Sequence, residues 1–439
     1  MKPAWASSSL SWLYLDLNSY FASVEQQEQP RLRGKPVAVV PVMTDSTSAI
    51  AASYEAKAFG IRTGTPIWEA KRLCPQIRLV PARHDVYVDY HHRILKEIDN
   101  HIPVARIGSI DEMACELMGR EKLKSEAMAL AQRLKDGLRR NVGDCIRCSI
   151  GIAPNGFLAK VASDLKKPDG LTVLEAADLP GPLLNLKLRD LPGIGANMER
   201  RLLDAGIDSL PALWELGPRE ARRIWGGIGG EMFWRELRGE IVHHAAQGRH
   251  SVSHSHVLPP ALRPAGQAEA VARRLAAKAI TRVRRIGCAA RMLHLSVRFD
   301  DMAREKWTAD FRLTETQDSF VVLDAVAQLW RRMCAETKAL HGRRVHKLGV
   351  ALTDLVPEAE TTGDLFGGGS GFEADPAQSE KRVKLAKAID KLNAKYKRDT
   401  VHIGPLPGTG SDRQKTGKGD FMGAKIAFNR IPDQAEFNE

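Results

Sequence analysis

Two apolar segments that carry acidic residues near one end place the strongest constraint on how this chain folds. Residues 13–17 have the apolar pattern of a buried strand with Asp16 near its end, and residues 106–112 are typical of a strand and turn that finish in Asp111 and Glu112. Carboxylates at strand ends converge when the strands are neighbours in one sheet, and three of them can hold two metal ions for in-line phosphoryl chemistry. An Asp after an apolar strand is also typical of a turn or a helix cap, so the pattern by itself leaves both interpretations open.

The positive charge of the chain is concentrated in one quarter of its length. The 439 residues include 65 Lys and Arg against 53 Asp and Glu, a formal net charge of +12. Residues 1–246 contribute 33 basic and 30 acidic side chains, residues 247–356 contribute 19 and 10, and residues 357–439 contribute 13 of each. The excess in residues 247–356 predicts a module that neutralises nucleic-acid phosphates, because each basic contact releases condensed counterions. A solvated face that keeps the protein soluble is the alternative.

Several classes of protein are excluded by simple counts. No stretch approaches the roughly 18 uninterrupted apolar residues that a membrane-spanning helix needs, so we expect no membrane association. The N-terminal apolar segment is interrupted by Asp16, and the six cysteines are too few for a disulfide scaffold. We therefore predict a cytoplasmic protein of about two to four domains.

At least six short motifs resemble those of the Y-family translesion DNA polymerases, in the same order. Residues 16–25 (Asp-Leu-Asn-Ser-Tyr-Phe-Ala-Ser-Val-Glu) resemble the first palm motif, and residues 109–112 (Ser-Ile-Asp-Glu) resemble the catalytic signature. The other matches lie at residues 34–39, 52–61, 149–155, 158–160 and 167–170. They fall within residues 10–356, and on them the chain is identified as a member of this family, of bacterial type and nearest the DNA polymerase IV and V branches.

The resemblance implies a catalytic centre with two Mg²⁺ ions. Asp16 and Asp111 would be shared by both ions, and Glu112 would bind the ion that activates the primer 3′-hydroxyl. The carbonyl of Leu17 would complete the other metal site. One ion lowers the pKa of the attacking hydroxyl, and the other holds the triphosphate and the leaving pyrophosphate.

The resemblance also implies a binding site for the incoming nucleotide. Phe21 would be a steric gate whose ring fills the space that a ribose 2′-hydroxyl needs, with a plain core aromatic as the alternative. The other nucleotide contacts would be Tyr20, Tyr54, Lys57 and Lys160.

In the fingers motif the chain departs from the family pattern. Many relatives carry Arg-Lys where this chain has Lys57 and Ala58, and Thr where it has Ala51. Because Lys lacks the bidentate fork of Arg, we expect triphosphate binding to be weaker or differently arranged.

Two modules are predicted to hold DNA. Gly193, Ile194 and Gly195 belong to a helix-hairpin-helix signature, in which backbone N–H groups approach a phosphate without reading sequence. A second glycine run at residues 226–230 is either another phosphate turn or a simple turn. Residues 247–352 have a β-α-β-β-α-β order, typical of a split βαβ module. Near the end of its first helix, Arg282, Arg284 and Arg285 either reach DNA or cap the helix.

These features predict an α+β multidomain fold, a right-hand polymerase with a ferredoxin-like palm, small fingers, a helical thumb with the helix-hairpin-helix, and a split βαβ little finger domain. The expected bounds are residues 1–30 and 80–172 for the palm, 31–79 for the fingers, 173–245 for the thumb, 247–356 for the little finger domain and 357–439 for a partly flexible tail.

The predicted function is low-fidelity translesion synthesis by a DNA-directed DNA polymerase without proofreading. A non-catalytic scaffold of the same fold is the alternative, but the chain keeps Asp16, Asp111 and Glu112. A nucleotide cyclase would leave the hairpin motif and the basic module unexplained. The expected partners are primer–template DNA and deoxynucleoside triphosphates, with a sliding clamp bound through Asp364-Leu365-Phe366. We expect a monomer associated with the nucleoid.

Overall fold

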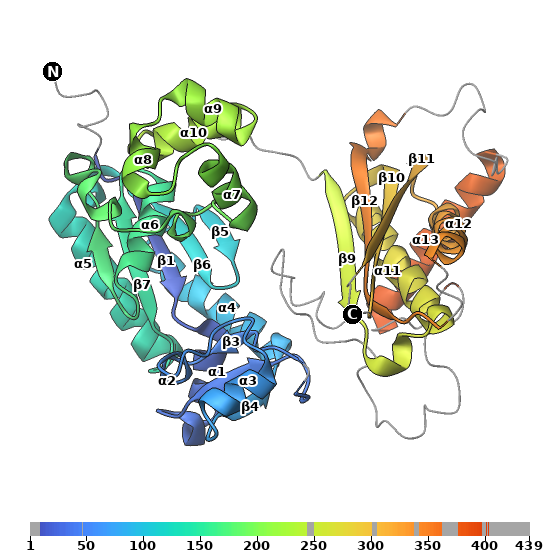
Figure 1. Ribbon diagram of the computed structural model, residues 1–439, viewed down its shortest axis with the longest axis horizontal. Coiled ribbons are helices and arrows are strands. Elements are labelled where there is room, and N and C mark those ends of the chain that lie inside the picture. Colours follow the sequence, from blue (N-terminus) through green and yellow to red (C-terminus); the bar gives the residue numbers. More distant parts are fainter. Residues whose placement is uncertain are drawn as a thin grey trace. The chain divides into compact units, whose positions relative to one another are not determined.

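The computed structural model describes residues 9–45, 47–243, 250–300, 305–337, 342–361, 376–396, 401 and 403. The chain divides into two compact units, with the boundary between His244 and Ala245. Figure 1 shows the elements of each unit. Within the described ranges, no helix is both long enough and apolar enough to cross a membrane.

A five-stranded sheet, the central sheet, organises the first unit, with strand order β5-β6-β1-β7-β8. The strands are β1 (Trp12–Leu17), β5 (Arg106–Ser109), β6 (Glu112–Glu116), β7 (Cys148–Ala153) and β8 (Leu171–Val173). β1 lies between β6 and β7, and Leu13 and Leu15 are fully buried in it. This burial explains why β1 is a nearly continuous apolar run in the sequence, with Asp16 as its polar exception.

Four helices accompany the central sheet, and two of them contribute to the candidate site. They are α1 (Tyr20–Glu28), α4 (His84–Asp99), α5 (Lys124–Gly137) and α6 (Gly156–Leu165). α6 packs on β1 and β7 (Figure 1), and Asn155 caps its first turn by accepting a hydrogen bond from the Leu158 N–H at 2.8 Å. α6 therefore lies directly over the strand that carries Asp16.

Residues 37–81 form a small three-stranded sheet of order β3-β2-β4. Its strands are β2 (Val37–Val40), β3 (Ala51–Ala52) and β4 (Arg78–Pro81), and its helices are α2 (Tyr54–Lys57) and α3 (Ile67–Leu73). Small side chains such as Ala38, Ala52 and Ala56 form much of its core. The motif at residues 34–39 leads into β2, all four residues of which are buried.

Short helices follow the central sheet and end the first unit. These are α7 (Ala196–Asp204), α8 (Leu210–Glu215), α9 (Pro218–Trp225) and α10 (Ile228–Leu237). Their apolar side chains share one core with α6, to which Leu202, Phe233 and Leu237 contribute. Single 3₁₀ or π turns connect elements at Pro30–Leu32, Gly119–Lys122, Leu138–Val142, Ala176–Asp178, Gly181–Leu183, Leu188–Asp190, Pro260–Leu262 and Glu358–Glu360.

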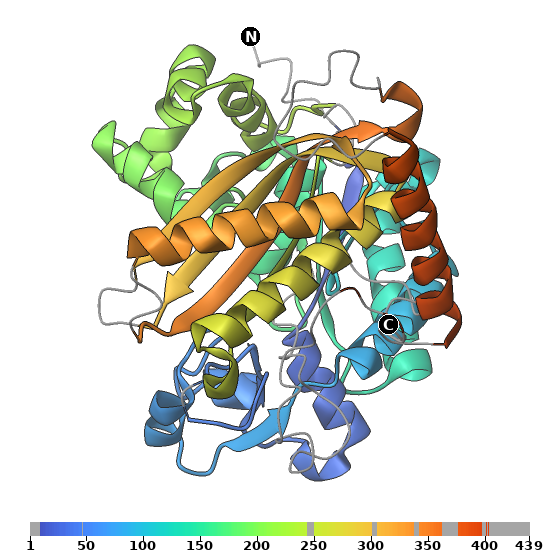
Figure 2. The ribbon, with the colours of Figure 1, turned by 90° about the vertical axis from the view of Figure 1, so that its right-hand side faces the viewer.

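The second unit is built on a four-stranded antiparallel sheet of order β11-β10-β12-β9. Its elements are β9 (Ser251–Val257), α11 (Ala265–Arg285), β10 (Cys288–Phe299), β11 (Lys306–Thr316), α12 (Ser319–Thr337) and β12 (Val345–Pro357). The predicted β-α-β-β-α-β order is confirmed. Figure 2 shows α11 and α12 lying together across one face of the sheet. The apolar core of this unit is formed by side chains of the two helices and of the sheet.

A further helix, α13 (Pro376–Tyr396), packs on α11 and α12 (Figure 2). Its Asp390 accepts hydrogen bonds from Arg284 Nε at 2.8 Å and from Thr281 Oγ1 at 2.9 Å. Arg284 also donates to the Gln317 carbonyl at 2.8 Å and is only 8% exposed. The Arg284 side chain is therefore part of the domain interior, and neither DNA contact nor simple helix capping describes it.

Candidate active site

The three predicted acidic residues come from adjacent strands of the central sheet. Asp16 of β1 is the direct cross-strand partner of Glu112 of β6, so both side chains project from the same face of the sheet. Asp111 lies in the turn between β5 and β6, and its carbonyl accepts the Leu17 N–H at 2.8 Å. Ser109 Oγ donates to Asp111 Oδ1 at 2.5 Å and fixes that carboxylate. The structure thus brings Asp16, Leu17, Asp111 and Glu112 together.

Two lysines contact these carboxylates. Lys160 of α6 places its Nζ 2.6 Å from Asp16 Oδ2 and 2.6 Å from Glu112 Oε1. Lys167 lies just beyond α6 and places its Nζ 2.6 Å from Asp16 Oδ1 and 2.7 Å from Asp164 Oδ1. Because Asp16 is only 5% exposed, its charge is balanced by these ammonium groups more than by water.

The electrostatics of the site show a concentration of negative charge. Burial raises the pKa of Asp111, and the charges of Asp16 and Glu112 raise it further, whereas the hydrogen bond from Ser109 lowers it. Burial alone would lower the pKa of Lys160, but the nearby carboxylates raise it, so the ammonium stays charged. Nearby cations offset the mutual repulsion of carboxylates that lie this close together.

The residues present supply the oxygen donors that a divalent cation needs, although their side chains are not arranged here as a metal cluster. In the described part of the chain, no three His, Cys, Asp or Glu side chains form a metal cluster, and the Lys160 ammonium lies between Asp16 and Glu112. Carboxylate and carbonyl oxygens are the ligands that hard divalent cations prefer. Asp16 and Glu112 therefore already converge on a cation, and Asp111 adds a further oxygen donor beside them.

Lys167 was not predicted as a site residue. It belongs to the motif at residues 167–170, so its presence there was a signal in the sequence. Its contact with Asp16, 151 residues away, depends on the position of α6 over β1, which no local pattern encodes.

Tyr54 and Lys57 lie on the short helix α2, with Lys57 Nζ 4.3 Å from the centroid of the Tyr54 ring. Burial lowers the pKa of Lys57, and the charge of Lys167 lowers it further, whereas Asp16 raises it. Burial raises the pKa of Tyr54. The charge of Lys167 lowers that pKa, and the charge of Asp16 raises it. Because the charges of Asp16 and Lys167 shift the pKa values of both residues, α2 lies near the carboxylate site.

Phe21 lies in the first turn of α1 and is half-buried. Its ring stacks on Tyr87 of α4, with centroids 4.3 Å apart and an interplanar angle of 14°. Tyr20 is 3% exposed and its hydroxyl donates to the Tyr87 carbonyl at 2.5 Å, so its side chain belongs to the core between α1 and α4. The predicted nucleotide contact of Tyr20 stays a prediction.

The predicted hairpin residues precede α7. Gly193 has a φ of +87°, which favours glycine, and neither Gly193 nor Gly195 has a neighbour within 4 Å of a Cβ placed there. The backbone at both glycines is therefore open to a ligand. Ile194 is 4% exposed and anchors the turn in the core shared with α6.

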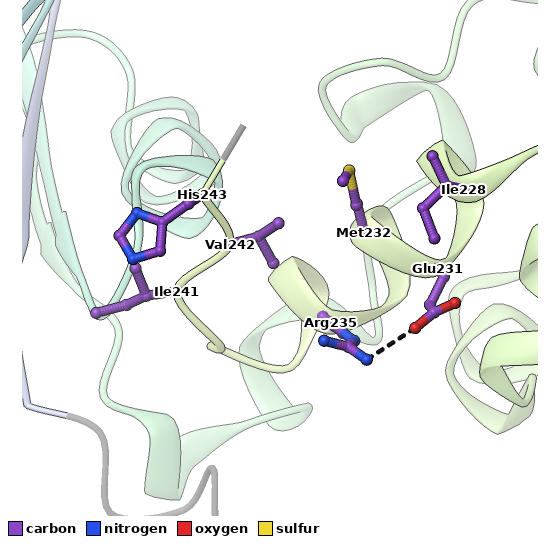
Figure 3. Close-up of a pocket in the computed structure, with 7 residues that line it drawn as sticks. All are labelled: Ile228, Glu231, Met232, Arg235, Ile241, Val242 and His243. Carbon is purple, nitrogen blue, oxygen red and sulfur yellow. Dashed lines mark hydrogen bonds and ion pairs between the residues drawn. The ribbon is translucent and has the colours of Figure 1, made fainter. Parts of the chain in front are cut away.

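The second glycine run has the same arrangement between α9 and α10. Gly226 ends α9 with a φ of +79°, and Gly227 precedes α10. One face of α10 and the segment after it line a cavity of about 310 Å³ (Figure 3). Its lining residues are Ile228, Glu231, Met232, Arg235, Ile241, Val242 and His243, with Glu231 and Arg235 joined by an ion pair of 2.7 Å. None of the predicted catalytic residues lines it.

The sheet of the second unit has one face that α11 and α12 leave uncovered. The strand register places Lys306, Arg298 and Lys347 side by side across β11, β10 and β12 on this open face. Beside this basic row the residues are small and polar, including Thr308, Ser296, Gly349 and Ser255. A flat face with a basic row is suited to phosphate contacts.

Comparison with known proteins identifies the family. Residues 15–164 match the impB/mucB/samB family, and residues 249–365 match the C-terminal domain of that family. A DNA polymerase IV of Moorella thermoacetica is 34% identical over 405 residues, covering 90% of this chain and 96% of the relative. The DNA polymerase IV 1 of Bacillus subtilis is 29% identical, covering 87% of this chain and 90% of the relative.

The chain belongs to the Y family of DNA polymerases. It is a DNA-directed DNA polymerase of the translesion type, and the non-catalytic scaffold is not favoured.

Solved Y-family structures share the fold. A Y-family DNA polymerase chimera of Dbh and Dpo4 gives a TM-score of 0.66 at 23% identity, covering 79% of this chain and 99% of that chain. An insertion ternary complex of Dbh DNA polymerase gives a TM-score of 0.52 with the same coverage. The predicted α+β fold of a right-hand polymerase is therefore confirmed, whereas the predicted domain bounds and site residues stay predictions. The predicted clamp segment at residues 364–366 lies outside the described residues.

Proposed function

We propose that Asp16, Asp111 and Glu112, with the Leu17 carbonyl, hold two Mg²⁺ ions for the transfer of a deoxynucleotide to a primer 3′-hydroxyl. Bound there, the ions would lower the pKa of the attacking hydroxyl and neutralise charge on the transferring phosphate. The observation that carries the proposal is the direct pairing of Asp16 with Glu112 beside Asp111, around a point where a cation already lies.

The lysines of the site are proposed to bind the triphosphate of the incoming nucleotide. Lys57, Lys160 and Lys167 are all cations at or near Asp16, and a triphosphate is the polyanion that such a group recognises. Metal ions at the carboxylates would release the ammonium groups of Lys160 and Lys167 toward the phosphates. The Tyr54 hydroxyl, whose pKa burial raises above its ordinary value of 10, is a hydrogen-bond donor on the helix that also carries Lys57.

Phe21 is proposed as the steric gate, and its half-exposed ring on α1 follows Asp16 by five positions. Tyr20 is proposed to contact the nucleotide through its backbone, because its side chain is buried.

Primer–template DNA is proposed to bind the hairpin at Gly193, Ile194 and Gly195 and the open face of the second unit. The hairpin offers backbone N–H groups, and the open face offers Lys306, Arg298 and Lys347. Both contacts are independent of base sequence, which suits a polymerase that moves along its template. We further propose a monomer in the cytoplasm, associated with the nucleoid, that binds a sliding clamp through Asp364-Leu365-Phe366.

Primer extension tests this function. Purified chain, Mg²⁺ and the four deoxynucleotides should extend a primer on undamaged templates and past a template lesion. Asp111→Ala should reduce kcat at least about 100-fold, because it removes a proposed metal ligand. Glu116→Gln is the matched control, because Glu116 is an exposed carboxylate at the far end of β6, the strand that follows Asp111. Extension that persists in Asp111→Ala would remove that residue from catalysis.

A further inference from the structure

The Phe21 ring rests on an aromatic platform that is itself anchored. Its stacked partner Tyr87 is completely buried. The His84 ring meets both edge-on, with centroids 6.2 Å from Phe21 and 5.9 Å from Tyr87. The Phe21 ring carries no polar group, so ring contacts such as the stack on Tyr87 help to set its position.

Tyr87 is held by a buried carboxylate. Its hydroxyl donates to Glu25 Oε1 at 2.8 Å, and Glu25 is completely buried. Arg83 donates two hydrogen bonds to the same carboxylate, from Nε to Oε1 at 3.0 Å and from Nη2 to Oε2 at 2.7 Å. Such a bidentate pair fixes direction as well as distance. We call Glu25, Arg83 and Tyr87 the gate anchor.

The gate anchor is more than a means of joining α1 to α4. Burying a carboxylate costs desolvation, and apolar residues of similar volume often stabilise a fold as well. Here the buried group orients one ring, and that ring lies flat against Phe21 at an interplanar angle of 14°. The buried carboxylate therefore holds the Tyr87 hydroxyl, and with it the ring that stacks on Phe21.

We propose that the gate anchor positions the Phe21 ring and thereby sets how strictly the enzyme rejects ribonucleotides. This inference rests on the proposed role of Phe21 as the steric gate. Releasing the Tyr87 hydroxyl lets the Tyr87 ring shift, Phe21 follows its stacking partner, and the space for a 2′-hydroxyl opens. Glu25, Arg83 and Tyr87 are positioning residues, since only Phe21 would contact the sugar.

The chain contains a matched control one helical turn away. Tyr90 donates to Glu28 Oε1 at 2.7 Å, which repeats the tyrosine–glutamate bond between α4 and α1 three residues further along each helix. The Tyr90 ring lies against Arg93, and within the described part of the chain no ring contact joins it to Phe21. If the two bonds only join α1 to α4, sugar discrimination should not change at either Tyr87 or Tyr90, whereas a positioning role predicts a change at Tyr87 alone.

The test is sugar discrimination, measured as the ratio of kcat/KM for a deoxynucleotide to that for the matching ribonucleotide in primer extension by the full chain. Tyr87→Phe keeps the stacking ring and removes only the hydroxyl, and it should lower the ratio about 3- to 10-fold, the effect of one hydrogen bond. Tyr90→Phe should leave the ratio unchanged. Arg83→Gln, at a half-exposed position, should lower the ratio too, and it carries the test if Tyr87→Phe does not fold.

A double variant separates failure of the inference from failure of the gate. Phe21→Ala should admit ribonucleotides, and adding Tyr87→Phe to it should cause no further loss of discrimination, because the anchored ring is gone. If Phe21→Ala leaves the ratio unchanged, the proposed gate is wrong. If Phe21→Ala lowers it while Tyr87→Phe and Arg83→Gln do not, or if the effects simply add, the gate stands and the gate anchor is overturned.

Discussion

Asp16 and Glu112 face each other across β1 and β6 and share the ammonium of Lys160, which lies 2.6 Å from an oxygen of each. Two carboxylates so placed repel each other unless a cation lies between them. The sheet therefore imposes a cation requirement on the site, which an ammonium or a metal ion can meet. If the proposed metal ions replace the ammonium groups at these carboxylates, the incoming triphosphate would be the new partner of Lys160 and Lys167.

The first prediction concerns Lys167, which pairs with Asp16 and Asp164. We expect Lys167→Ala to raise the KM for the incoming nucleotide about ten-fold, because a hydrogen bond to a charged phosphate is lost. The kcat should change less, since the carboxylates remain. Steady-state single-nucleotide insertion measures both constants.

The neighbouring Lys166 is the control for this prediction, because it is exposed and has the same charge. Lys166→Ala should leave KM unchanged. Equal effects of the two variants would show that the positive field of the segment, not a specific contact, attracts the nucleotide.

The second prediction concerns His91 of α4, whose Nδ1 lies 2.8 Å from the carbonyl of Ile110, directly before Asp111. Burial lowers the pKa of His91 to about 4, from an ordinary value of 6.5. Between pH 6.5 and about 4 the imidazole of His91 is protonated in the unfolded chain but neutral in the folded chain. The contribution of His91 to folding stability is therefore fully present above pH 6.5 and is lost as the pH falls toward 4.

Denaturant unfolding between pH 4 and 7 tests this linkage. Relative to His91→Gln, the wild type should lose up to about 3 kcal/mol more over this range, the order that such a pKa difference implies. Parallel pH profiles of the two proteins would contradict a buried, neutral His91.

The sequence allowed the proposed catalytic carboxylates to be predicted as neighbours because their signal is local. A strand with one polar residue near its end and a strand–turn with two predict side chains at a sheet edge, and the register of Asp16 with Glu112 bears out their proximity. The alternating pattern of β10 and the spacing of α11 similarly encode the order of the second unit.

The missed features depend on contacts that are distant in the sequence. Glu25 and Arg83 are 58 residues apart in the sequence, and Arg284 and Asp390 are 106 residues apart. The local hydrophobic periodicity of the sequence therefore cannot predict either ion pair. An arginine at the end of an amphipathic helix has the same sequence pattern whether it reaches DNA or a buried aspartate. Only the position of α13 decides between these two roles.

The third prediction follows from that helix. Asp390→Ala should destabilise the second unit by about 1 to 3 kcal/mol, because Arg284 is buried and would lose its charged partner. Amide hydrogen exchange of the full chain should show the loss as reduced protection in α13 and at the end of α11. Lys387→Ala is the control, because it breaks an exposed pair with Glu358 whose loss should cost less than about 0.5 kcal/mol. Unchanged protection in Asp390→Ala would mean that contacts other than the Arg284–Asp390 pair, such as those of the buried Ala386, hold α13.

The last prediction concerns the open face of the second unit, where Lys306, Arg298 and Lys347 form a row across three strands. If these side chains contact phosphates, changing all three to Gln should reduce the slope of log K against log salt for DNA binding by up to about 2.7, at 0.9 per contact. The matched control changes Lys381, Lys384 and Lys391 of α13 to Gln, which alters the net charge of the chain equally. Fluorescence anisotropy of labelled primer–template DNA over a salt series measures the slope. An equal reduction in both triple variants would mean that the surplus charge acts through its overall field, whereas a change confined to the sheet variant would place the DNA on the open face.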